Sequence, residues 1–282
     1  MTNRELLIDS ASPWATVVVG SLYTALILIG TVTAIGLILK SLQTPVDWKS
    51  RIQQLRDRPW SWKEALALIG LIGLLIGLST ILSGLLHQPR EATVIVIQSL
   101  LLDVTGLAAI AALVVSRGWT GATAFGMSSG PLTFLKPGIV FYAALMPFMV
   151  FASLVYQGIL FMNGYPPELQ EIALLLSADQ PLWLRLFMIG LAVAIAPLFE
   201  ECLFRGILLP ILVRKTGIGA GIFITSLIFA SIHLHLPSLA PLMVVAAGFS
   251  IAYLYTGSLW VSIVMHSLFN GVNLALLLVL RH

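Results

Sequence analysis

The chain has 282 residues, of which 59% are hydrophobic and only 10% are charged, whereas soluble domains average about 45–50% apolar and 25% charged residues. This composition excludes an ordinary soluble protein and indicates a polytopic membrane protein with no room for a separate soluble domain. The net charge of +3 does not indicate a nucleic-acid partner, because the basic residues gather in loops, where they act as topology signals.

A helix needs about 20 apolar residues to cross a bilayer, and the chain contains about eight such stretches. We expect spans at 14–39, 64–86, 93–115, 138–162, 184–209, 218–235, 239–256 and 259–280. The predicted fold class is therefore all-α, a polytopic membrane helix bundle with about eight transmembrane helices. The proline-started run 166–176 is typical of a short interfacial helix or of a surface connector, and the connector is the preferred interpretation.

Basic residues in the loops predict the orientation, because short cytoplasmic loops are enriched in Lys and Arg. The loops 40–63, 116–137 and 210–217 hold ten of the fifteen basic residues. The opposite side holds four, at Arg4, Arg90, Arg185 and Arg281. We therefore expect a multi-pass protein of a bacterial cell membrane or a related membrane, with both termini on the non-cytoplasmic side.

The fifth span contains two adjacent carboxylates, Glu200 and Glu201, in an otherwise apolar stretch. Ionisable groups inside a bilayer cost about 2.5–3.5 kcal/mol each, so they usually face the protein interior and carry function. On a helix, Glu201 and Arg205 share a face, whereas Glu200 points about 100° away. We expect Glu201 to pair with Arg205 while Glu200 stays free to act as a base. For the pair itself, a purely structural lock is the favoured interpretation.

Two later spans repeat this four-residue spacing. His266 and Asn270 lie on one face of the last helix, where an imidazole and an amide can both donate hydrogen bonds to one point. In the sixth span, Phe229 and His233 share a face, so the ring is expected to pack beside the imidazole. The set contains a base, a second acid–base group and two donors, which hydrolysis of an amide by an activated water requires. For each single histidine, a hydrogen bond between helices is the alternative.

Three other residues carry weaker signals. Asp103 is expected to be a buried partner or a helix-end residue, and His235 and Cys202 are expected to pack or to line an interface. Cys202 is the single cysteine of the sequence, which excludes an internal disulfide and a metal site with several cysteine ligands.

Three motifs thus follow one another in apolar helices: Glu200-Glu201-x-x-x-Arg205, Phe229-x-x-x-His233 and His266-x-x-x-Asn270. This pattern resembles the CPBP family, the CAAX-protease and bacteriocin-processing (Abi) intramembrane proteases, which include the type II CAAX prenyl endopeptidases. The resemblance covers about residues 138–280. It implies one integrated membrane domain, in which 138–282 forms a CPBP/Abi-like catalytic core and 1–137 supplies N-terminal transmembrane helices and a basic cytoplasmic loop.

The resemblance also implies a role for each motif residue. Glu200 and His233 would activate the attacking water, His266 and Asn270 would stabilise the oxyanion, and Glu201 with Arg205 would be a supporting ion pair. No cofactor is expected, because the family is generally regarded as glutamate-based and this sequence lacks the His-Glu-x-x-His spacing of a zinc protease. The alternative is zinc bound by Glu200, His233 and His266, since two imidazoles and a carboxylate form a known catalytic ligand set.

The favoured function is an intramembrane endopeptidase that acts on a membrane-embedded protein, a lipidated protein or a peptide. A non-proteolytic membrane scaffold or immunity protein of the same fold is the alternative. A transporter is a third hypothesis, because membrane carboxylates and histidines also form proton relays, but two inverted halves with broken helices are not visible in the sequence.

Counting along the helices predicts how the site is reached. If the fifth span ends near Pro210, Glu200 lies about 15 Å from that end. His266 lies about 10 Å from the start of its helix, and His233 about 22 Å from the start of the sixth span. We therefore expect a water-filled cavity that opens toward the cytoplasm, with a lateral gap for a lipid-linked or transmembrane substrate.

Overall fold

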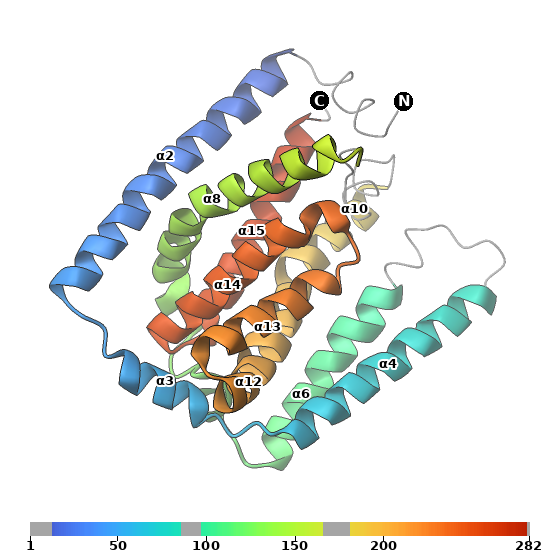
Figure 1. Ribbon diagram of the computed structural model, residues 1–282. Helices are drawn as coiled ribbons and strands as arrows, with labels where there is room; N and C mark the ends of the chain where they lie inside the picture. The colour runs from blue at the N-terminus through green and yellow to red at the C-terminus, as the bar shows by residue number, and fades with distance from the viewer. Residues whose placement is uncertain (1–12, 86–96, 166–180, 281–282) are drawn as a thin grey trace.

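The computed structural model describes residues 13–85, 97–165 and 181–280, and in this part of the chain every regular element is a helix (Figure 1). The α-helices before the motif region are α2 (Pro13–Gln43), α3 (Trp48–Arg56), α4 (Trp62–Leu85), α6 (Thr105–Ser116), α7 (Gly121–Phe125) and α8 (Pro131–Met162). The π-helical turn η1 (Leu100–Val104) runs directly into α6. The expected connector or interfacial helix at 166–176 lies outside the described residues.

The motif region begins with a long helical run from Leu182 to Thr216. It consists of α10 (Leu182–Gly190), η2 (Leu191–Ile195), α11 (Ala196–Glu201), η3 (Cys202–Leu208) and α12 (Leu209–Thr216), where η2 and η3 are π-helical. The remaining elements are α13 (Ile218–Ser231), the 3₁₀ turn η4 (Leu236–Ser238), α14 (Leu239–Thr256) and α15 (Leu259–Leu280).

Seven helical runs of the described part are long and apolar enough to cross a membrane. They include the long run Leu182–Thr216 and both C-terminal helices, so the prediction of an all-α polytopic membrane bundle is confirmed. The sixth predicted span, 218–235, is the exception, because α13 has only 14 residues. At about 1.5 Å per residue it reaches about 21 Å, less than the hydrocarbon thickness of about 30 Å.

The early end of α13 has a local cause. Leu234 adopts φ 49°, in the left-handed region that normally follows a helix C-terminus and that a branched side chain rarely enters. The chain turns there and returns as α14, so α13 and α14 form a helical hairpin whose tip carries His233 and His235.

The helices are arranged around α8, α14 and α15, which share an apolar core of Tyr142, Met146, Phe249, Val261 and Met265. Helix α2 lies along α8 at one edge of the bundle, while α4 and α6 form the opposite edge (Figure 1). Glycine allows helices to approach closely, as at Gly30, which packs on the backbone of Ala143. Such close packing lets van der Waals contact hold the two helices together. The division of the domain into 1–137 and 138–282 stays a prediction.

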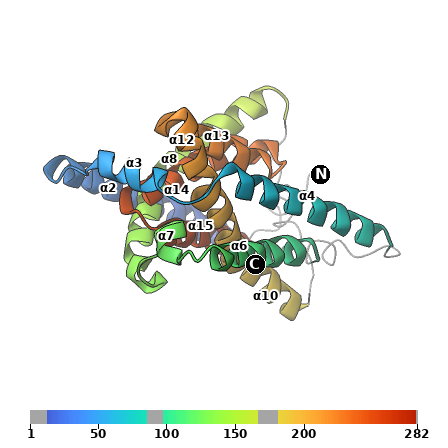
Figure 2. The same cartoon turned by 90° about the horizontal axis from the view of Figure 1, so that it is seen from below.

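The three basic loops meet at one end of the bundle, around α3, α7 and α12 (Figure 1; Figure 2 shows this end from below). Their arginines also tie the loops together. Arg58 donates to the carbonyls of Ala122 (2.8 Å) and Gly257 (3.1 Å). Arg214 donates to the carbonyls of Arg56 (2.9 Å) and Arg58 (2.8 Å). Interpreting these residues only as topology signals was therefore incomplete, because their guanidinium groups also bond backbone carbonyls at this end of the bundle.

Candidate active site

The two glutamates lie on α11, between two π-helical turns that the sequence analysis did not predict. Pro197 and Pro210 explain both turns, because proline has no N–H to continue the ordinary helical pattern. Just before Pro197, the N–H of Ala196 bonds the carbonyl of Leu191, five residues earlier. The same wide bond joins Leu209 to Phe204 just before Pro210. Wide turns of this kind are frequent at functional sites.

Glu201 is the centre of a buried polar cluster. Its Oε1 atom accepts a hydrogen bond from Nη1 of Arg205 at 2.6 Å and lies 2.8 Å from Nδ1 of His266. Both Glu201 and Arg205 are 0% exposed. The geometry is that of the predicted ion pair, and the contact with His266 adds a partner that spacing along one helix could not reveal.

Arg205 is held from three other directions. Its Nη2 atom donates to the carbonyl of Ala246 at 3.1 Å, and its guanidinium lies over the rings of Phe229 at 4.5 Å and Phe249 at 5.3 Å. Guanidinium groups are attracted to aromatic faces, most strongly where water is excluded. Phe229 therefore supports the buried arginine, a contact that the sequence did not predict, besides packing on His233 at 4.9 Å as expected.

His266 is placed between the two carboxylates. Its Nδ1 atom donates to Glu201, because an ionised carboxylate can only accept. Its other nitrogen, Nε2, lies 3.9 Å from Oε2 of Glu200, which is too long for a direct hydrogen bond. A neutral His266 would turn a lone pair toward the Glu200 carboxylate, whereas an imidazolium turns an N–H toward it.

Glu200 differs from its neighbour in exposure and in partners. Its side chain is 21% exposed, and Oε2 has no hydrogen-bond partner among the described residues. Glu200 thus presents a carboxylate to the cavity, whereas Glu201 is fully buried and both of its partners bind Oε1, which leaves its Oε2 without a partner among the described residues. This arrangement matches the predicted division between a free and a paired carboxylate.

His233 follows the end of α13 at the tip of the hairpin. Its Nδ1 atom lies 2.7 Å from the carbonyl oxygen of Phe229. A carbonyl only accepts, so Nδ1 carries the hydrogen, and in the neutral tautomer that this selects Nε2 has the lone pair. Because His233 also lines the cavity that contains Glu200, this lone pair is suited to accept a proton there.

Asn270 has a partner that was not predicted. Its Nδ2 atom donates to the carbonyl of Ala192 at 2.7 Å. That carbonyl lies in η2, five residues before Pro197, which has no N–H to offer it. Asn270 and His266 were expected to donate to one point, but one N–H of the Asn270 amide is used to tie α15 to the kinked fifth span. The amide has a second N–H, and Asn270 still lines the cavity.

One cavity of about 880 Å³ joins Glu200, His233, His266 and Asn270. Its wall also includes Asp103, which the sequence placed only as a buried partner or helix-end residue, and His235, whose Nδ1 is 2.8 Å from Oγ of Ser238. Cys202 is buried in the apolar core, as expected. Other polar wall residues gave no signal in the sequence, because each is a single uncharged group in an apolar helix; they are Tyr23, Ser99, Ser153, Gln157 and Asn273.

The cavity lies in the half of the bundle away from the basic loops. It is lined by the C-terminal part of α8, from Met149 to Gln157, and by the N-terminal part of α14, from Pro241 to Val245. The sequence analysis expected the cavity to open at the basic-loop end, so this prediction was wrong. It assumed that the fifth span ends near Pro210, but the helix continues to Thr216, so Glu200 lies about 24 Å from the basic-loop end.

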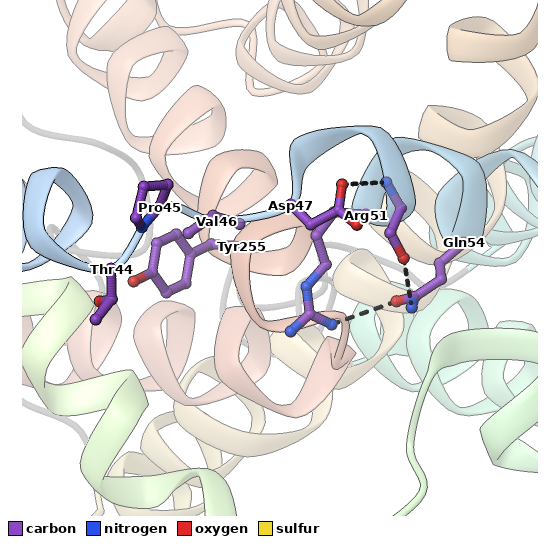
Figure 3. A pocket seen from close by; sticks show the side chains of 8 residues that line it. Thr44, Pro45, Val46, Asp47, Arg51, Gln54 and Tyr255 are labelled. Atoms are coloured by element: carbon purple, nitrogen blue, oxygen red, sulfur yellow. Dashed lines mark hydrogen bonds between the residues drawn. The ribbon is translucent and has the colours of Figure 1, made fainter.

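A smaller cavity of about 450 Å³ lies at the basic-loop end, between the end of α2, the start of α3 and Tyr255 (Figure 3). Its polar lining includes Arg51, whose Nη1 donates to Oε1 of Gln54 at 3.3 Å. None of the motif residues lines it, so the larger cavity is the candidate active site.

Among the described residues, no group of three His, Cys, Asp or Glu side chains is arranged to hold a metal ion. The candidate zinc ligands Glu200, His233 and His266 share the cavity, but their side chains do not form a ligand cluster.

Comparison with protein families matches residues 181–272 to the family described as type II CAAX prenyl endopeptidase Rce1-like. Neither a curated protein nor a solved structure gives a significant match. The matched segment contains every residue of the three motifs, and the family points to a protease of the CAAX type within a membrane. The match therefore confirms the predicted resemblance: residues 181–272 are similar to the Rce1-like, type II CAAX prenyl endopeptidases.

Proposed function

We propose that the protein hydrolyses peptide bonds within the membrane, using a water molecule activated by Glu200 and His233. The observation that carries this proposal is the different state of the two neighbouring carboxylates. Glu201 is enclosed by Arg205 and His266, whereas Glu200 faces a cavity that it shares with both histidines. A carboxylate that served only packing would be expected to be paired, as Glu201 is.

The reaction follows from the atoms around the cavity. The Glu200 carboxylate takes a proton from water as the water oxygen bonds to the scissile carbonyl carbon, and the Nε2 lone pair of His233 holds that water by accepting its other hydrogen. The carbonyl oxygen becomes an oxyanion, which Nε2–H of His266 and the free N–H of Asn270 stabilise. As the carbon–nitrogen bond breaks, Glu200 returns its proton to the leaving amine. The products are a carboxylic acid and an amine.

The supporting residues keep this geometry. Glu201 fixes the ring orientation of His266, while Arg205 balances the charge of Glu201 at a fully buried position. A hydrogen bond to one ring nitrogen orients a catalytic imidazole, so that its other nitrogen faces the reacting atoms. No metal ion takes part in the proposed reaction, and a zinc-dependent enzyme remains the alternative that the experiment below distinguishes.

The substrate is proposed to be a membrane-embedded protein, a lipidated protein or a peptide. The cavity wall is mostly apolar, and no Lys or Arg of the described residues lines it, which suits an apolar chain whose scissile bond lies among a few polar groups. In the proposed orientation, the basic loops face the cytoplasm and both termini face the other side.

The proposal is tested with purified protein in proteoliposomes, using a prenylated peptide that ends in a CAAX sequence and an unprenylated control, with products identified by mass spectrometry. Glu200→Gln should slow cleavage about 10²–10⁴-fold, and Asp57→Asn, an exposed carboxyl-to-amide control on the α3 cap, should not. Activity should persist in a chelator.

Cleavage by Glu200→Gln at the parent rate would contradict the proposal. Loss of activity in a chelator, with recovery on adding zinc, would instead establish a zinc-dependent enzyme. A parent protein that cleaves none of a broad peptide panel would favour the scaffold or immunity protein.

A further inference from the structure

Asp103 is an acidic residue of the cavity that lies outside the matched segment 181–272. It is on η1, the π-helical turn before α6. Among the described residues, neither a hydrogen bond nor an ion pair engages its carboxyl group. An ionisable side chain without a partner inside a membrane protein is a candidate functional residue.

The position of Asp103 relative to Glu200 is fixed by close packing. Gly106, one turn after Asp103, lies against the ring of Phe199, the residue before Glu200. A Cβ atom at Gly106 would overlap that ring, so a glycine is what allows the two helices to approach this closely. Both η1 and α6 contact α11. The two carboxyl groups are therefore held on neighbouring, tightly docked helices rather than on a mobile loop.

The charges around the cavity are unbalanced. Asp103 and Glu200 line the same cavity, and no Lys or Arg among the described residues lines it. The other titratable groups there are Tyr23, His233, His235 and His266. Two carboxylates that share a site of low dielectric cannot both be ionised without a large penalty, so such a pair holds a proton between its members. Nε2 of His266 lies 3.9 Å from Oε2 of Glu200, whereas among the described residues neither an ion pair nor a hydrogen bond engages Asp103, so Asp103 is the better place for the proton.

We propose that Asp103 is a positioning residue of the reaction: its protonated carboxyl donates a hydrogen bond, through a cavity water, to the Glu200 carboxylate. This bond orients Glu200 and its attacking water without contact between Asp103 and the substrate. The proposal rests on the proposed proteolysis and adds to it a residue from the N-terminal helices.

Three substitutions separate a hydrogen-bond role from a structural one. Asp103→Asn keeps a hydrogen-bond donor, so kcat should stay within a few-fold of the parent. In the parent, activity should fall at alkaline pH as Asp103 loses its proton, and Asp103→Asn should lack this fall. Asp103→Leu removes the donor and should lower kcat about 10- to 100-fold, as expected for loss of a hydrogen bond to a charged group, with KM and thermal stability little changed. Thr105→Leu, on the same helical run but outside the cavity lining, is the control and should stay near the parent.

A second measurement does not depend on cleavage. The infrared spectrum of the parent at neutral pH should contain the carbonyl band of a protonated carboxylic acid, and Asp103→Asn should lack it. A band that persists in Asp103→Asn, or Asp103→Leu with the kcat and pH profile of the parent, would overturn the inference even if Glu200→Gln is inactive. If the parent cleaves nothing, the proposed function fails, and the infrared spectrum still decides whether Asp103 carries the proton.

Discussion

The two halves of the molecule differ in which side chains they expose and which they bury. Helices α2 and α4 expose large aliphatic groups, such as Val32 and Leu74, over much of their length. The region from α11 to α15 instead buries charged and polar groups, among them Glu201, Arg205 and His266. In a bilayer, exposed aliphatic surface is solvated by lipid, so it says little about function. Buried polar groups are the informative feature, because each must be satisfied or used.

The N-terminal half also contains two acidic residues in its spans, and they illustrate the same distinction. Glu64 lies 2.8 Å from Nη2 of Arg117 and accepts further bonds from Ser61, so it is a satisfied structural group at a helix start. Asp103 has no such partner among the described residues and faces the cavity. Burial alone therefore does not identify a reactive group, whereas an unsatisfied carboxyl group in a shared cavity does.

The largest effect is expected for Arg205→Ala, which leaves the Glu201 charge buried without its ion-pair partner. Removing one member of a buried pair costs about 3–5 kcal/mol, so we expect loss of folded yield in detergent together with loss of activity. Arg56→Ala, at an exposed position of α3, is the matched control. A thermal stability of Arg205→Ala equal to that of Arg56→Ala would show that the cluster does not stabilise the core.

A smaller effect is expected for Asn270→Ala. The change leaves the Ala192 carbonyl without its side-chain donor, at a cost of about 1–3 kcal/mol, and it also removes an oxyanion donor. The midpoint temperature of thermal unfolding and kcat should therefore both be lower than in the parent. Asn163→Ala removes a similar bond to the Ile159 carbonyl at an exposed helix end and should change stability by less than about 0.5 kcal/mol. If stability of Asn270→Ala equals that of the parent, the tie to the fifth span is unimportant.

Arg58→Ala should weaken the basic-loop end without affecting the chemistry. It removes donors to the Ala122 and Gly257 carbonyls, and we expect a loss of about 1–2 kcal/mol in stability with kcat of the folded protein unchanged. Arg51→Ala, whose side-chain partner is Gln54 on its own helix, should be close to neutral. A fall in kcat for Arg58→Ala at full stability would show that this end of the bundle communicates with the cavity.

Cysteine labelling disturbs the structure least, and it tests from which face of the membrane the cavity is accessible. In a Cys202→Ser background, Gln157→Cys on the cavity wall and Ser50→Cys in α3 should react with an impermeant reagent from opposite faces of the membrane. Labelling of Ser50→Cys from the cytoplasmic face would support the proposed orientation. Labelling of both positions from one face would contradict the location of the cavity relative to the basic loops.

Much of the fold could be predicted because hydropathy reports directly on membrane spans. The end of α13 could not, since it depends on a left-handed Leu234, and periodicity carries no information on a single φ angle. The π-helical turns around Glu200 were also missed. Pro197 and Pro210 were the available signal, because a proline within an apolar run removes a backbone donor.

The candidate site was predictable where it depends on one helix and unpredictable where it depends on two. Four-residue spacing correctly paired Glu201 with Arg205 and Phe229 with His233. The contact of His266 with Glu201 and that of Asn270 with Ala192 join residues 65 and 78 positions apart, so only tertiary packing determines them. The same holds for the wall position of Asp103.

The central claim is that Glu200 reacts while Glu201 supports the structure, and parallel measurement of Glu200→Gln and Glu201→Gln tests it most directly. For each purified variant, kcat and the midpoint of thermal unfolding in detergent are measured with one peptide substrate. We expect Glu200→Gln to lose about 10²–10⁴-fold in kcat with the unfolding midpoint of the parent, and Glu201→Gln to unfold at a clearly lower temperature. Equal losses of stability in the two variants, or a Glu200→Gln protein that cleaves as fast as the parent, would contradict the account.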